Sequence, residues 1–164
     1  MMLELHNVAI GQRINHLSLT VSSGQIVPVT GSRGAGKTTL LRAVLGFIPV
    51  DEGHISIDGE LLTPLSAPYF RRQMAYVPQQ LLLPDDYDDM GLGQWNSLTE
   101  DERYVLLLTN AVRTEKPLLI VDEPAADISR ETMATVDRLL SEAAGRGCTV
   151  LAVNSRILQN QVVL

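Results

Sequence analysis

The chain is poor in cysteine, in basic residues and in long apolar runs. Its one cysteine, Cys148, rules out a disulfide framework, and the apolar run that follows favours a small buried side chain over a reactive thiol. Acidic residues number 19 against 13 lysines and arginines, which argues against nucleic acid as a main partner because duplex-binding faces carry excess positive charge. No run approaches the 18 or so apolar residues of a membrane span, and no basic leader opens the sequence. We therefore expect a cytoplasmic protein that reaches the inner face of the cell membrane only through a partner.

What the chain does contain is a complete phosphate-binding loop. Residues 31–39 follow the pattern G-x-x-x-x-G-K-[ST], between an apolar run that predicts a strand and a periodic segment that predicts a helix. Its backbone N–H groups would surround a phosphate at the positive end of the helix dipole. Lys37 would reach the β- and γ-phosphates, and the Thr38 hydroxyl would bind Mg²⁺. The expected nucleotide-binding residues of this loop are Gly31, Ser32, Arg33, Gly34, Ala35, Gly36, Lys37, Thr38 and Thr39.

Strand and helix patterns alternate along the rest of the chain. Apolar patterns predict further strands at 3–8, 17–21, 54–59, 76–77 and 118–121. Helical patterns follow Thr99 and Ser129. Pro28 falls where the pattern predicts a central strand, so we expect a local bulge around its missing N–H group. This order of elements predicts one α/β domain with a mainly parallel sheet.

Two carboxylates follow the predicted strand at 118–121. Asp122 and Glu123 would lie at its carboxyl end, where open α/β sheets bind ligands. Asp122 would bind Mg²⁺ through water, and Glu123 would polarise the attacking water. An acidic turn is the alternative interpretation of Val-Asp-Glu-Pro taken alone, but a P-loop upstream favours the nucleotide site.

With these motifs the chain resembles the nucleotide-binding subunits of ATP-binding cassette (ABC) ATPases over nearly its whole length. The resemblance extends to residues 55–59, to residues 74–79, which are similar to the family's Q-loop, and to the closing strand at 162–164. It implies a P-loop NTPase fold in one domain, residues 1–164, with an N-terminal antiparallel β subdomain. It also implies ATP and Mg²⁺ as ligands, contacts from Gln79 to Mg²⁺ and the attacking water, and two cassettes that sandwich ATP head to tail.

The family's L-S-G-G-Q signature is altered in this chain. It falls on residues 98–102, where Thr99 and Glu102 form a capping box and two acids, Glu100 and Asp101, replace the glycines. We expect the capping box to satisfy the helix donors internally and the acids to repel a phosphate. An ordinary capped helix and a surviving weak signature both stay open as interpretations.

Further positions that complete the family's site also differ. Ser155 stands in place of the switch histidine, and Ser129 in place of the aspartate that ends the D-loop. No aromatic residue precedes the P-loop to stack on adenine, so Arg13 is the candidate for that contact. The helical subdomain is much reduced, to about residues 80–98, and its acidic run at 84–89 favours a solvated loop over a docking site for a basic partner.

The resemblance implies an ATP-binding subunit of an ABC transporter, an ATPase weakened by its altered signature. Expected catalytic residues are Glu123, Gln79 and Lys37, and expected Mg²⁺ ligands are Thr38, Gln79 and Asp122. Expected partners are an integral-membrane permease and a second ABC ATPase, in a homodimer or a heterodimer. The alternative is a regulatory domain that binds ATP without efficient turnover, which Ser155 favours and Glu123 disfavours. A small-molecule kinase is disfavoured because no arginine-rich lid is visible.

Overall fold

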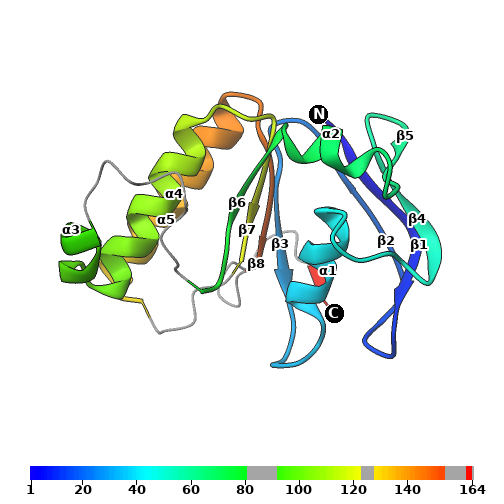
Figure 1. Ribbon diagram of the computed structural model, residues 1–164, viewed down its shortest axis with the longest axis horizontal. Helices are drawn as coiled ribbons and strands as arrows, with labels where there is room; N and C mark the ends of the chain where they lie inside the picture. Colours follow the sequence, from blue (N-terminus) through cyan, green and yellow to red (C-terminus); the bar gives the residue numbers. More distant parts are fainter. Residues whose placement is uncertain (81–91, 123–127, 154–161, 164) are drawn as a thin grey trace.

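The computed structural model describes residues 1–80, 92–122, 128–153 and 162–163, which form two sheets and the helices packed on them (Figure 1). In chain order the elements are β1 (Leu3–Ile10), β2 (Ile14–Val21), β3 (Ile26–Thr30), α1 (Lys37–Val44), β4 (Glu52–Ile57), β5 (Glu60–Leu61), α2 (Ala67–Arg71), β6 (Met74–Val77), α3 (Leu92–Ser97), α4 (Glu100–Arg113), β7 (Leu118–Val121), α5 (Arg130–Gly145), β8 (Thr149–Val153) and β9 (Val162–Val163). Among these described helices, none has the length and apolar character needed to cross a membrane.

The first sheet is antiparallel, with strand order β2-β1-β4-β5, as expected for the N-terminal subdomain. Its inner face is apolar because alternate residues of β1, such as Leu3 and Leu5, are buried. The hairpin from β4 to β5 turns at Asp58 and Gly59, whose positive φ angles of 51° and 81° suit the predicted Asp-Gly turn.

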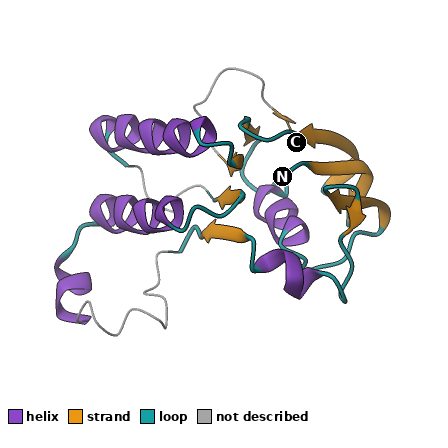
Figure 2. Cartoon of the chain, turned by 90° about the horizontal axis from the view of Figure 1, so that it is seen from above, coloured by secondary structure: helices purple, strands orange, loops and turns teal. Residues whose placement is uncertain are grey.

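The second sheet is parallel, with strand order β6-β7-β8-β3-β9. Helices α4 and α5 lie on one face, and α1 lies on the other face, between the two sheets (Figures 1 and 2). Apolar side chains fill both spaces and form two core clusters. Trp95, from α3, is buried in the cluster under α4 and α5. Burial raises the pKa of the half-buried Cys148 thiol, in line with an unreactive side chain.

Pro28 does not produce the expected bulge, so that prediction was wrong. Strands β3 and β8 pair without a register shift from Ile26 to Val29. The Gln25 carbonyl accepts a hydrogen bond from the Val150 N–H on β8 at 2.8 Å. Because successive strand residues direct their backbone groups to alternate neighbours, Pro28 faces away from β8. On that side β9 pairs only with Val29 and Thr30 among the described residues, so the missing N–H group leaves the β3–β8 ladder intact.

Candidate nucleotide-binding site

The P-loop connects the parallel sheet to α1 through three glycines with positive φ. Gly31, Gly34 and Gly36 have φ values of 152°, 86° and 101°, which other residues adopt only with strain. Gly36 is the N-cap of α1 and supplies no side-chain cap, and the Leu40 N–H donates to its carbonyl at 2.8 Å. The first turn of α1 contains no acidic residue. The start of this helix therefore offers backbone donors to an anion.

Lys37 crosses the loop that precedes it. Its Nζ donates to the Gly31 carbonyl at 2.8 Å and to the Ser32 carbonyl at 3.1 Å. These two bonds fix the ammonium above the loop and leave one of its three donors for a phosphate. The surrounding sequence is entirely without negative charge, since no acidic residue occurs between Glu4 and Asp51. An acidic chain thus has a locally positive region at its P-loop.

The carboxyl ends of β6 and β7 lie at the same edge of the sheet as the P-loop (Figure 1). Asp122 follows β7 and is only 2% exposed, the one acidic residue in the described part of the chain that is buried. Its N–H donates to the Val77 carbonyl at 2.8 Å, and its own carbonyl accepts from the Tyr104 hydroxyl at 3.2 Å. Gln79 is exposed two residues beyond β6. The structure therefore brings Gln79, Asp122 and the P-loop to one edge.

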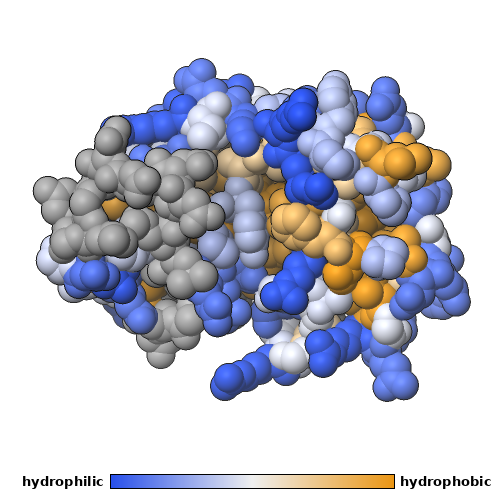
Figure 3. Space-filling model, in the orientation of Figure 1, coloured by the Kyte–Doolittle hydropathy of each residue, from blue (hydrophilic) through white to orange (hydrophobic). Residues whose placement is uncertain are grey.

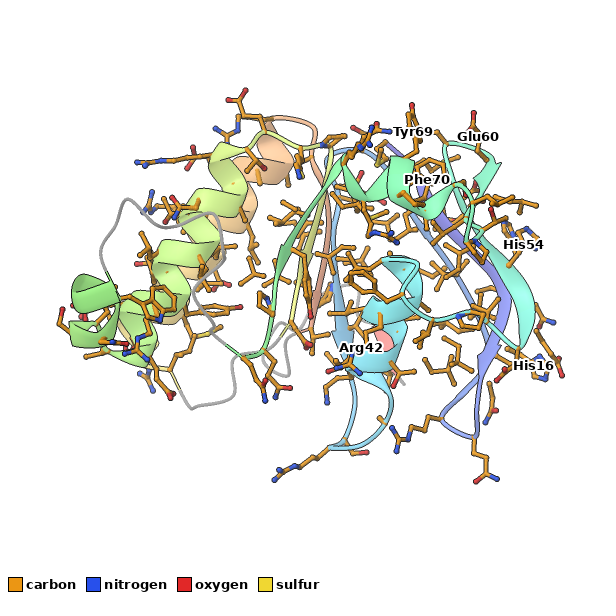
Figure 4. The ribbon with its side chains drawn as sticks, viewed as in Figure 1. His16, Arg42, His54, Glu60, Tyr69 and Phe70 are labelled. Carbon is orange, nitrogen blue, oxygen red and sulfur yellow. The ribbon has the colours of Figure 1, made fainter. Side chains whose placement is uncertain are left out.

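Electrostatics link the Asp122 carboxylate to groups near α1. Burial raises the pKa of Tyr76, the negative charge of Asp122 raises it further, and Arg42 on α1 opposes both effects. Tyr76 packs against the core cluster that contains α1, and Figure 4 shows Arg42 on that helix. The Asp122 carboxylate is therefore within electrostatic reach of groups on the P-loop side of the sheet.

The turn between β1 and β2 lies directly against the P-loop. A Cβ added to Gly36 would be 3.1 Å from the Cβ of Arg13 and 3.2 Å from Cγ1 of Ile14. Arg13, predicted from its position before the P-loop, is thus next to the start of α1. Glu123, Ser155 and the acidic run at 84–89 lie outside the described residues.

The start of α4 is closed by its own side chains, as predicted. Thr99 is the N-cap: its N–H donates to Oε2 of Glu102 at 2.8 Å, and the Glu102 N–H donates to Oγ1 of Thr99 at 3.3 Å. Sequence reasoning missed the contact of Asp101, whose Oδ2 accepts from the Ser129 N–H at 3.0 Å and from the Thr132 hydroxyl at 2.7 Å. Asp101 therefore joins the starts of α4 and α5 instead of facing solvent freely.

Comparisons with known proteins agree with this geometry. A family model described as ABC transporter matches residues 14–91. An uncharacterized ABC transporter ATP-binding protein of Rhizobium meliloti (strain 1021) is 28% identical over 180 residues, covering 88% of this chain and 66% of that protein. The lipopolysaccharide export system ATP-binding protein LptB of Escherichia coli (strain K12) is 28% identical over 194 residues, covering 93% of this chain and 78% of that protein. A solved structure of an ATP-binding subunit of an ABC transporter has the same fold, with a TM-score of 0.80 at 19% identity, covering 100% of this chain and 86% of that one.

Both sequence alignments are longer than the 164-residue chain itself. The two relatives therefore have residues, within the aligned region, that this chain lacks. The chain spans about two thirds of the length of the Rhizobium protein.

Proposed function

We propose that the chain is an ATP-binding protein of the ABC transporter family, which it resembles, and that it binds ATP with Mg²⁺ at its P-loop and hydrolyses the ATP to drive a membrane permease. The P-loop carries this proposal. It combines an uncapped helix start with the Lys37 ammonium held above it, at the edge of the sheet where Asp122 is buried. We place the reduced helical subdomain at about residues 80–98. The relatives have residues within the aligned region that this chain lacks, which is consistent with a shortened subdomain.

The residues at this edge fit a magnesium ion. Thr38 supplies a hydroxyl from the first turn of α1, Asp122 a buried carboxylate, and Gln79 an amide oxygen at the end of β6. Oxygen ligands of this kind, completed by phosphate and water, are those that Mg²⁺ prefers. When bound, Mg²⁺ neutralises charge on the phosphate oxygens.

The proposed hydrolysis depends on Glu123, which follows Asp122 directly in the chain. The Asp122 backbone bonds to the Val77 carbonyl of β6 and to the Tyr104 hydroxyl, so the residue that precedes Glu123 is held in place. Glu123 would accept a proton from the attacking water. Lys37 would stabilise the negative charge that develops on the phosphate oxygens.

An apolar groove beside α1 offers a surface for the permease. It runs between the end of α1 and β5 and is lined largely by apolar residues, and Figure 3 shows apolar side chains gathered on this part of the molecule. Phe47 and Leu61 line the groove and are 58% and 54% exposed, while Leu65 and Tyr69 nearby are 94% and 61% exposed. The Arg71 guanidinium lies 5.2 Å from the centre of the Phe47 ring. Because exposed apolar patches mark interaction sites, we assign this groove to an apolar cytoplasmic segment of the permease.

The experiment that tests the function is ATP binding and hydrolysis by the purified chain, with Lys37→Ala and Glu123→Gln as variants. Lys37→Ala should weaken ATP binding by about 3 kcal/mol, or about 100-fold, because it removes a charge that contacts the phosphates. Lys116, the chain's other lysine, donates to the Met74 carbonyl, so Lys116→Ala is a matched control with unchanged affinity. Glu123→Gln should bind ATP normally and slow its hydrolysis by about 100-fold or more.

Equal ATP affinity in wild type and Lys37→Ala would refute the site. A wild-type chain that binds ATP but hydrolyses it no faster than Glu123→Gln would support the alternative, a nucleotide-sensing domain without turnover. The internally capped start of α4 is the observation that favours this second candidate.

A further inference from the structure

All three histidines of the chain lie in the antiparallel sheet. They are His6 on β1, His16 on β2 and His54 on β4. The strands of this sheet also contain three glutamates and no lysine or arginine. Figure 4 shows His16 and His54 on the side of the sheet that faces away from α1. This surface therefore combines nitrogen ligands with negative charge, which favours a cation.

His6 and His54 form a pair across two neighbouring strands. They are directly opposite each other in the register of β1 and β4. Their rings stack, with centroids 4.8 Å apart and an interplanar angle of 26°. Both residues are exposed, so each ring can turn about its terminal torsion, which has broad minima. Such a turn brings one nitrogen of each ring toward a common ion without a change in the backbone.

Glu4 lies beside His6 on the same strand. Because it precedes His6 by two residues, both side chains are on the same face of the sheet. Its Oε1 is 3.8 Å from Nε2 of His6, and its Oε2 accepts from the Ser56 hydroxyl at 3.3 Å. Ser56 is directly opposite Glu4 on β4. A carboxylate beside one nitrogen of a metal-binding histidine holds that N–H group and orients the ring. Glu4 therefore leaves Nδ1 of His6 for a metal.

We infer that His6 and His54 bind a divalent transition-metal ion of the kind that imidazole prefers, such as Zn²⁺. Mg²⁺ and Ca²⁺ favour oxygen ligands instead. In the described part of the chain, no three side chains of His, Cys, Asp or Glu form a group that could hold a metal. The site therefore has two protein ligands, and water completes the coordination. It is independent of the proposed nucleotide site, because none of its residues belongs to the P-loop or to the sheet edge beside it.

The test is a calorimetric titration of the purified, tag-free chain with Zn²⁺, without nucleotide. Wild type should bind Zn²⁺. His6→Thr and His54→Thr, which keep side chains suited to a strand, should each weaken binding by about tenfold or more. Glu4→Gln should weaken it by about tenfold, because a carboxylate that orients a ligand contributes about 10- to 100-fold. His16→Asn is the matched control and should not change the affinity. It removes the third imidazole of the sheet, and asparagine tolerates the positive φ of 49° at this position.

Nuclear magnetic resonance of the wild-type chain provides a readout that needs no variant. Zn²⁺ should shift the imidazole nitrogen resonances of His6 and His54 and leave those of His16 in place. The opposite pattern would overturn the inference, as would absence of Zn²⁺ binding in wild type.

The variants distinguish a metal site from a stacked pair that only stabilises the sheet. Unchanged Zn²⁺ affinity in both His6→Thr and His54→Thr would overturn the inference and leave the pair a structural role. An equal loss in His16→Asn would overturn it too, because the whole surface and not the pair would then attract the ion. Melting temperatures measured without Zn²⁺ separate loss of a ligand from loss of the fold.

Discussion

Replacing Asp101 by alanine should destabilise the chain, because this carboxylate joins the starts of two helices. Its Oδ2 accepts from the Ser129 N–H at 3.0 Å and from the Thr132 hydroxyl at 2.7 Å. Ser129 is also the N-cap of α5, and its side chain accepts from the Thr132 N–H. Asp101→Ala would leave the Ser129 side chain in place and remove only the link to α4.

The expected loss is about 1 kcal/mol in the free energy of unfolding. Loss of a capping acceptor costs about 0.5–2 kcal/mol, and the lower half applies here because water can replace the carboxylate at this exposed helix end. For a chain of this length, 1 kcal/mol lowers the melting temperature by about 2–4 °C. Glu100→Ala is the matched control. Glu100 precedes Asp101 in the same helical turn, is exposed, and makes no hydrogen bond or ion pair within the described residues, so only a helix-dipole effect of about 0.3–0.5 kcal/mol would be lost.

The pH dependence of this effect identifies the carboxylate as its source. The hydrogen bond from the Ser129 N–H, followed by that from the Thr132 hydroxyl, lowers the pKa of Asp101 below its usual range. Because the folded pKa is below the unfolded value of about 4, the ionised carboxylate contributes its full stabilisation above that pH and loses it as the pH falls through the folded pKa. Thermal melts followed by circular dichroism should therefore show a constant gap between wild type and Asp101→Ala from pH 6 to 8, which narrows below about pH 4. The reasoning fails if Glu100→Ala costs as much as Asp101→Ala, or if the gap is unchanged at pH 3.

Two further predictions concern the partners. If the proposed permease binds the apolar groove, Phe47→Asp should release the chain from the membrane fraction of cells that also produce that permease, because the substitution places a charge in the groove. Val163→Asp, at a side chain that is 72% exposed on β9, is the control and should leave the chain in the membrane fraction. The Glu123→Gln substitution should prevent turnover of bound ATP. Sedimentation velocity of this variant with ATP and Mg²⁺ should show a monomer, because the three acids in the first turn of α4 would repel the ATP of a second copy. An ATP-dependent dimer would contradict this prediction.

The features that local sequence could predict are those whose causes are local. The Gly-rich loop between a strand and a helix, and the capping box from Thr99 to Glu102, depend on residues a few positions apart, and the structure shows both. The Asp101 bond to Ser129 spans 28 residues and exists only because α4 packs beside α5. Nothing in the sequence around Asp101 distinguishes it from Glu100, so the sequence predicts the same role for both acids, repulsion of a phosphate.

Pro28 shows the same limit at the level of the backbone. Its position in a strand was evident from the apolar run, but its cost depended on which neighbour its nitrogen faces. That direction follows from the bond between Gln25 and Val150, a contact between strands far apart in the chain. The contact of Arg13 with Gly36 is of the same kind, since the hairpin and the P-loop meet only in the folded chain.

The starts of α1 and α4 differ in the property that decides whether a helix can receive a phosphate. At α1 the N-cap is a glycine and the first turn has no acid, so its donors are available to an anion. At α4 the Thr99 and Glu102 N–H groups bond to the chain's own side chains, and the first turn carries Glu100, Asp101 and Glu102. The family resemblance implies a head-to-tail pair of cassettes. If both chains of the pair were identical, each ATP would face this acidic helix. Each carboxylate about 4 Å from a phosphate charge would cost about 1 kcal/mol even in water, and more where water is excluded. A second cassette without these acids avoids that cost, so we propose that a different chain completes the P-loop site.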